Sequence, residues 1–242
     1  MKRNLTIDID KILSSHIDSP LKDDLNLSLQ SFAKRCDYSR LHYHELQKYI
    51  GDDKLLMERS GLQFTEKGDL FPHRRYYEAH AIAFTQNLHA AYDSVPLMIT
   101  LLLRQPRFNG KDFPVKKIGW NQITLDYLKS SSPHQKKLIT NFIRLSSNHD
   151  FLVLKGLVNQ AKHKFLVRIL NDNKNLHFEK IRYHPQPWAG ASVHQKGLHL
   201  DDSGMATVEN LNVADFMKRC HNNLLPRLYL LIARAQQSNT QI

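Results

Sequence analysis

The sequence predicts a mainly α-helical protein, a helical bundle that carries a small β-hairpin appendage. Apolar residues recur at helical spacing along several long stretches, whereas period-two alternation around turn-rich or loop segments appears near residues 166–183 and 206–211. A chain of 242 residues with 41% hydrophobic residues can bury the core of one domain. We therefore expect a single domain over 1–242. Its bundle core would comprise about 20–165 and 212–238, with an insert over about 166–211.

Local signals place the helices. Ser19-Pro20 is a typical N-cap and first-turn pair, which opens the first long helix. Pro96 predicts a bend in the second long helix, and Pro226 predicts an interruption of the last one. Glycines and prolines predict loops over 51–72 and 104–118. The helices are expected at about 20–50, 73–103, 120–130, 134–147, 149–165 and 213–237.

The β appendage follows the fifth predicted helix. FLVRIL and LHFEKIRY flank the turn-rich NDNKN, which predicts a hairpin over about 166–183. A segment rich in proline and glycine then leads to ATVENL, which predicts a short strand before the last helix.

The second long helix should bury one stripe of apolar side chains and carry a polar pair at its margin. His89 and Asp93 are four residues apart, so their side chains can touch on a helix. Ala83, Ala90 and Ser94 form a strip of small residues that would let another helix approach closely. The predicted core stripe consists of Tyr77, Ala81, Phe84, Leu88, Ala91 and Val95.

The helix predicted at 149–165 carries a second polar pair on an otherwise apolar segment. Asn159 and His163 are four residues apart, with Lys155 and Lys162 beside them. Gly156 lies on the same side, where a missing side chain would admit a neighbouring helix or a ligand. Bundle sites are commonly built from inward-facing residues on adjacent helices. We therefore predict one polar site that joins Asn159 and His163 to His89 and Asp93 of the earlier helix.

The charge of the chain favours an anionic partner. The net charge is +11 and the sequence pI about 9.6, which makes nucleic acid the first candidate. Two stretches combine cations for phosphates with aromatic rings for unstacked bases, as single-stranded RNA binding requires. These are residues 104–120, with Arg104, Arg107, Lys111, Lys116 and Lys117, and residues 71–77, with Arg74 and Arg75.

Other features bound the compartment. Only Cys36 and Cys220 occur, and their spacing does not match a metal motif, which fits a reducing cytoplasm. The N-terminus lacks a signal-peptide core, and the longest apolar run, at 95–103, is too short to span a membrane. We expect a cytoplasmic protein without a membrane partner.

Three short motifs resemble those of the HEPN superfamily, in particular the helical proteins encoded near prokaryotic defence and toxin–antitoxin genes. They are YxxxHA from Tyr76, NLHxxYD from Asn87 and NxxKH from Asn159, and the similarity covers about residues 73–170. The resemblance implies a HEPN-like bundle and a dimeric, metal-independent ribonuclease without a cofactor. It further implies RNA as partner, and an antitoxin or defence-system protein as a second one.

The family signature is an arginine, four to six residues and a histidine, often with a polar residue directly after the arginine. Asn159 matches the polar position and His163 the histidine, whereas Val158 stands where the arginine is expected. The resemblance thus implies His163 as the acid/base group, since histidine titrates near neutrality. Lys162 or Lys155 would replace the arginine in stabilising phosphoryl charge. His89 and Asp93 would orient the imidazole or supply a second acid/base group.

Two other classes remain open. Glu78, His89, Asp93 and His163 offer nitrogen and oxygen ligands for a divalent ion. Alternatively, the same polar residues form a buried hydrogen-bond network in a binding or assembly module without chemistry.

Overall fold

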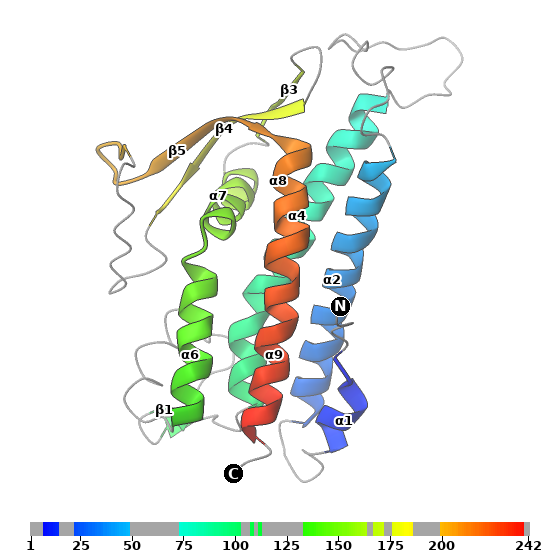
Figure 1. Ribbon diagram of the computed structural model, residues 1–242, viewed down its shortest axis with the longest axis vertical. Coiled ribbons are helices and arrows are strands. Elements are labelled where there is room, and N and C mark those ends of the chain that lie inside the picture. Colours follow the sequence, from blue (N-terminus) through cyan, green and yellow to red (C-terminus); the bar gives the residue numbers. More distant parts are fainter. Residues whose placement is uncertain are drawn as a thin grey trace.

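The structure is a computed structural model that describes residues 7–14, 22–48, 73–102, 107–108, 111–112, 133–163, 167–171, 176–185 and 199–239. Its helices are α1 (Ile9–Ser14), α2 (Lys22–Gln47), α4 (His73–Leu102), α6 (Pro133–Ser146), α7 (His149–His163), α8 (Val213–Arg219) and α9 (Leu225–Asn239). A π-helical turn, η2 (Cys220–Leu224), joins the last two. The prediction of a mainly α protein with a small antiparallel sheet is confirmed (Figure 1).

Long helices run side by side in the bundle. Helix α2 packs along α4, and α9 packs against both α4 and α6 (Figure 1). All six residues of the predicted core stripe of α4 are buried, which confirms that stripe. The small-residue strip also receives a helix: Arg35 of α2 donates to the Ala90 carbonyl at 2.6 Å and to Ser94 Oγ at 2.9 Å.

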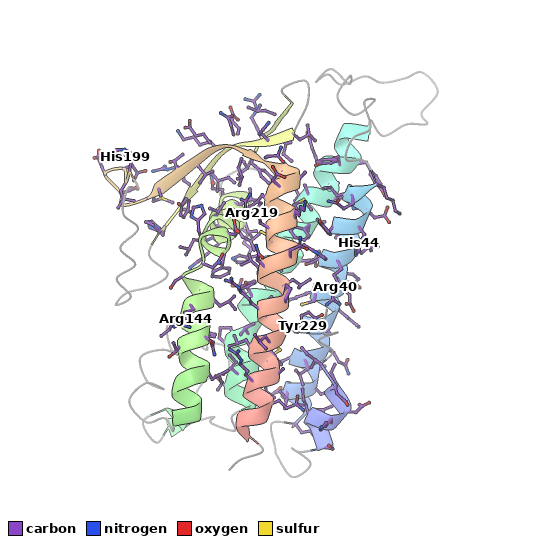
Figure 2. The ribbon with its side chains drawn as sticks, in the orientation of Figure 1. Arg40, His44, Arg144, His199, Arg219 and Tyr229 are labelled. Carbon is purple, nitrogen blue, oxygen red and sulfur yellow. The ribbon has the colours of Figure 1, made fainter. Side chains whose placement is uncertain are left out.

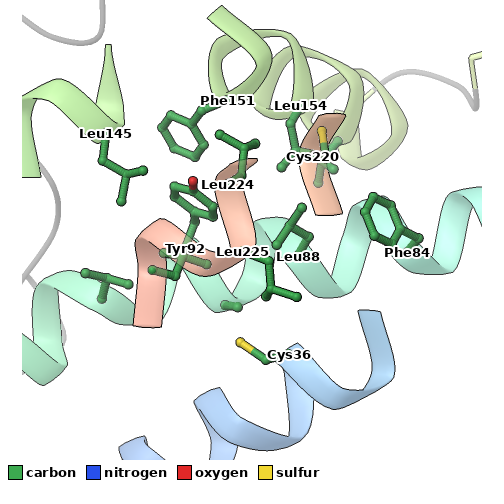
Figure 3. Close-up of a cluster of buried hydrophobic side chains, with 14 of the residues drawn as sticks. Cys36, Phe84, Leu88, Tyr92, Leu145, Phe151, Leu154, Cys220, Leu224 and Leu225 are labelled. Atoms are coloured by element: carbon green, nitrogen blue, oxygen red, sulfur yellow. The ribbon is translucent and has the colours of Figure 1, made fainter. Parts of the chain in front are cut away.

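The centre of the bundle is formed by α2, α4, α7 and the last helix together. Figure 3 shows side chains from these elements in one apolar cluster, with Cys36 and Cys220 among them. The ring of Tyr92 stacks on that of Phe151, with centroids 4.3 Å apart, which joins α4 to α7. Both cysteines are free and buried, and burial raises the pKa of the Cys36 thiol to about 12. Both cysteine side chains are therefore part of the hydrophobic core.

The α-helix is interrupted near Pro226, as the sequence predicts, but by a π-helical turn and not by a break in the chain of hydrogen bonds. The chain continues through η2, where the Leu225 N–H donates to the Cys220 carbonyl five residues earlier. Proline lacks an N–H, and its ring crowds the preceding turn of an α-helix. A wider turn directly before Pro226 relieves that crowding, so the helix runs on from α8 to α9.

A three-stranded antiparallel sheet lies over α7, in the order β3 (Ile169–Asn171), β4 (Leu176–Tyr183), β5 (Ala206–Asn212) (Figure 1). The predicted hairpin and the predicted strand in ATVENL are both confirmed. Phe178 pairs with Ile169 on one side and with Leu211 on the other. Strand β4 buries Leu176 and Phe178 in its first half and Ile181 and Tyr183 in its second half, so the alternation of buried residues shifts by one position between Phe178 and Ile181.

Some predicted elements fall elsewhere. The predicted loop at 104–118 contains a small ladder of β1 (Arg107–Phe108) with β2 (Lys111–Asp112). The Asn-Gly pair between them is a hairpin signal that the loop prediction overlooked. The predicted loop at 51–72 and helix at 120–130 lie outside the described residues. No helix in the described ranges is long and apolar enough to cross a membrane.

Candidate functional site

Helix α7 starts at a cap that the sequence encodes. Asn148 Oδ1 accepts from the Phe151 N–H at 3.4 Å, and the Asn148 carbonyl accepts from Leu152. Ser147 instead donates to the Ile143 carbonyl of α6 at 2.8 Å. The cap ends one helix and begins the next within two residues, which fixes the direction of α7 under the sheet.

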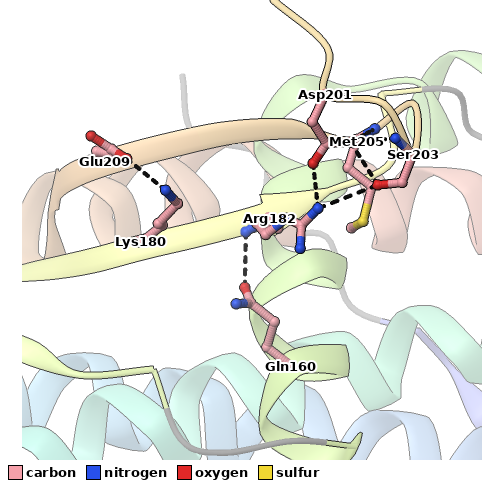
Figure 4. Close-up of polar contacts among 7 residues, drawn as sticks. All are labelled: Gln160, Lys180, Arg182, Asp201, Ser203, Met205 and Glu209. Carbon is pink, nitrogen blue, oxygen red and sulfur yellow. Dashed lines mark hydrogen bonds and ion pairs between the residues drawn. The ribbon is translucent and has the colours of Figure 1, made fainter.

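Gly156 sets how closely α7 approaches β4. A Cβ atom at this position would lie 2.6 Å from the Arg182 carbonyl oxygen and 2.6 Å from Tyr183 Cβ. One turn further on, Gln160 Oε1 accepts from the Arg182 N–H at 2.9 Å (Figure 4). Strand β3 pairs with residues 176–178 of β4 and ends before it reaches Arg182. Gln160 therefore supplies the hydrogen-bond acceptor that the Arg182 N–H would otherwise lack on this edge of β4.

A pocket of about 270 Å³ opens between α7 and the sheet. Asn159 and His163 both line it, although both are exposed rather than buried. The complete lining consists of Leu152, Lys155, Gly156, Asn159, Gln160, His163, Arg182, Tyr183, His184 and Met205.

Basic side chains come from both walls of this pocket. Lys155 and His163 come from α7, and Arg182 and His184 come from β4 and the residue after it. Among the described residues that line the pocket, none carries a carboxylate. Two facing walls of cations and imidazoles make an anion the favoured occupant.

Arg182 is held at the pocket by a neighbouring turn. Its Nη2 donates to Asp201 Oδ2 and to Ser203 Oγ, the latter at 3.3 Å (Figure 4). Asp201 Oδ1 accepts from the backbone N–H groups of Ser203 and Met205, each at 3.0 Å. The Ser203 hydroxyl, the Met205 N–H and the Arg182 guanidinium hold the pKa of the Asp201 carboxyl far below its usual range. Asp201 therefore stays ionised and orients Arg182.

The His89–Asp93 pair forms as predicted, with His89 Nδ1 3.1 Å from Asp93 Oδ2. His89 is only 3% exposed, whereas the Asp93 side chain is about half exposed. Burial alone would raise the pKa of Asp93, but the contact with His89 and the positive charges of Lys162 and Lys155 outweigh it and lower that pKa. The pair thus faces the lysines of α7.

The residues predicted to form one site divide between two neighbouring places. Asn159 and His163 line the pocket, whereas His89 and Asp93 are not part of its lining. Lys155 belongs to both places, because it lines the pocket and its charge acts on Asp93. Lys162 acts on Asp93 and does not line the pocket.

Sequence reasoning missed the contribution of the sheet. Arg182 and His184 were not among the predicted site residues, although the period-two pattern of LHFEKIRY opposes Arg182 to the buried Ile181 and Tyr183. Gly156 predicted a close approach at this position, but the expected neighbour was a helix or a ligand, whereas the structure has strand β4 there. That contact is what brings Arg182 to His163.

The predicted RNA-binding cations cannot be placed as side chains. Arg104, Lys116 and Lys117 lie outside the described residues. Arg107 and Lys111 belong to β1 and β2, and Arg74 and Arg75 to the first turn of α4, but their side chains also lie outside what the structure describes.

The metal alternative of the sequence is not realised. Within the described ranges, no three His, Cys, Asp or Glu side chains stand grouped so as to hold a metal ion. Glu78, His89, Asp93 and His163 therefore form no such group. Of the four, His89 and Asp93 are in contact with each other, and His163 lines the pocket next to the sheet.

The chain was also compared with protein-family models, with curated proteins and with solved structures, and no significant match was found.

Proposed function

We propose that this protein binds RNA at the pocket between α7 and β4 and cleaves it without a metal ion. The observation that carries the proposal is the lining of that pocket, in which Lys155, His163, Arg182 and His184 face one space without a carboxylate. A phosphodiester is the anion that a basic protein with a net charge of +11 would meet most readily as nucleic acid.

The pocket offers the groups that transesterification of RNA requires. One imidazole accepts the proton of the 2′-hydroxyl while its oxygen attacks the adjacent phosphorus. The bond from phosphorus to the 5′-oxygen breaks, and the second imidazole donates a proton to that oxygen. The products are a 2′,3′-cyclic phosphate and a 5′-hydroxyl end. His163 and His184 supply the two imidazoles from opposite walls, and Arg182 and Lys155 stabilise the charge on the phosphoryl oxygens.

The arginine of this pocket also bears on the family resemblance. Val158 occupies the place of the motif arginine and is buried in the core, so that position cannot contribute a charge. Arg182 also lines the space that His163 lines, although it comes from a strand and its guanidinium is paired with Asp201. We therefore propose a HEPN-like ribonuclease with a relocated arginine. The homodimer and the antitoxin or defence-system partner that the resemblance implies belong to the same proposal.

The test uses the full chain and a 5′-labelled single-stranded RNA in excess EDTA. Wild-type protein should produce fragments that end in 2′,3′-cyclic phosphates, because no step needs a metal. His163→Ala and His184→Ala should each lower the rate by about 10²–10⁴-fold, the usual contribution of a general acid or base. His199→Ala is the matched control, since His199 is an exposed histidine that does not line the pocket (Figure 2).

Measurements of RNA affinity on the wild-type protein and its variants distinguish RNA binding from RNA cleavage. RNA affinity should fall steeply with salt and should weaken in Arg182→Ala. Salt-dependent binding without any cleavage would overturn the catalytic half of the proposal and favour the non-catalytic binding module. Cleavage that requires a divalent ion, or that is unchanged in His163→Ala, would assign the activity to another site.

A further inference from the structure

A second group of polar side chains lies between α2 and α4 and does not line the pocket. The Nδ1 atoms of His42 and His80 face each other at 2.9 Å, and both rings are partly buried. The ring of Tyr76 packs edge-on against His80, with centroids 4.2 Å apart. Glu45 lies one turn after His42 on α2, and its negative charge acts on both imidazoles.

We propose that His42, His80 and Glu45 bind one divalent first-row transition-metal ion across the α2–α4 interface. Two histidines and one carboxylate are a ligand set that zinc, cobalt, nickel and iron(II) accept. With metal–nitrogen distances of about 2.0–2.1 Å, nitrogen atoms 2.9 Å apart subtend roughly 90° at the ion. This is the angle between neighbouring ligands of a six-coordinate site, whose other positions would hold water.

The facing Nδ1 atoms of His42 and His80 can bind a metal ion in place of the hydrogen bond between them. As they stand, one Nδ1 must donate a proton to the other, which fixes the two rings in different tautomers. A metal ion replaces that proton and accepts both lone pairs.

Glu45 must turn to complete the site. Its Oε1 now accepts from Lys48 Nζ at 2.6 Å, and that hydrogen bond is the main cause that lowers the pKa of Glu45. With the side chains as they stand, the described residues hold no group of three ligands, so the site forms only when Glu45 leaves Lys48. The Lys48 side chain is 63% exposed, so its ammonium can move into water when the carboxylate turns toward the histidines.

The test titrates metal-free protein with Co²⁺, follows the visible absorption of the bound ion, and displaces it with Zn²⁺. Wild-type protein should bind one ion at this site, with affinity that falls at acid pH as protons compete. His80→Gln and His42→Gln should each weaken Co²⁺ binding by at least about tenfold, and Glu45→Gln should weaken it as well. His44→Gln is the matched control, because His44 is on the same helix and its ring lies against His221 instead.

The outcomes are independent of RNA cleavage. Zn²⁺ should raise the Tm of wild-type protein and of His44→Gln, but not that of His80→Gln. Circular dichroism of the metal-free variants establishes that they are folded, and His80→Asn replaces His80→Gln if the latter does not fold. Equal binding by wild-type protein and both histidine variants, or no binding by wild-type protein, overturns the site. Unchanged binding by Glu45→Gln overturns the role of the carboxylate.

Discussion

Gly156→Ala tests whether the contact between α7 and β4 is as close as the structure shows. The new methyl group would lie 2.6 Å from the Arg182 carbonyl oxygen and 2.6 Å from Tyr183 Cβ. Neither atom is the flexible end of a side chain, so the strand backbone must move. Overpacking of this kind costs about 1–3 kcal/mol, and we expect the upper part of that range against backbone. Replacing glycine by alanine within a helix returns about 1 kcal/mol.

The expected net loss is about 1–2 kcal/mol of unfolding free energy, which corresponds to a fall in Tm of about 2–8 °C for a chain of this size. Thermal and urea unfolding of the full chain measure both quantities. Asn159→Ala is the control, since Asn159 is exposed on the same helix and its replacement adds helix propensity without a clash. It should leave Tm unchanged or slightly raised. A Gly156→Ala protein as stable as Asn159→Ala would refute the close contact.

Two further predictions concern charge. Burial first, and then the charges of His44 and Arg40, lower the pKa of His221 below 6.5 despite an opposing hydrogen bond to Asn222. The unfolded chain therefore binds this proton more readily, and stability is lost as the pH falls from about 6.5 through the lowered pKa. His221→Gln should flatten the Tm profile between pH 7 and 5, and parallel profiles would contradict this. Asp201→Asn removes the carboxylate that organises the turn over 201–205, so amide exchange there should accelerate, and unchanged exchange would show that the turn holds without it.

The parts of the fold that follow from periodicity were predictable. The stripe on α4 was correct because its residues are buried by neighbours on one side of a continuous helix. The hairpin of β3 and β4 was correct because period-two alternation surrounds a turn-rich segment. The π-helical turn was not predictable in this way, since an interruption and a widened turn before Pro226 leave the same pattern in the sequence.

Of the two walls of the pocket, the sequence predicted only the one that α7 contributes. Asn159 and His163 share a face of α7, and that follows from their spacing. The opposite wall depends on which element packs over α7, and spacing along the chain says nothing about it. The expected partner was α4, through His89 and Asp93, whereas the pocket is closed by β4. Both neighbours exist, and α7 presents Lys155 at the boundary between them.

Gly156 explains how two neighbours can surround so short a helix. Without a side chain at this position, the backbone of β4 lies directly on α7, which leaves the residues beside Gly156 to form the walls of a pocket. Asn159 and His163 then project past the strand on one helix face, while Val158 and Leu154 enter the core on another. The side-chain oxygen of Gln160 accepts from the Arg182 N–H, which holds the strand backbone against α7 at the pocket. Gly156, which has no side chain of its own, therefore determines how the sheet packs on α7 and where the walls of the pocket lie.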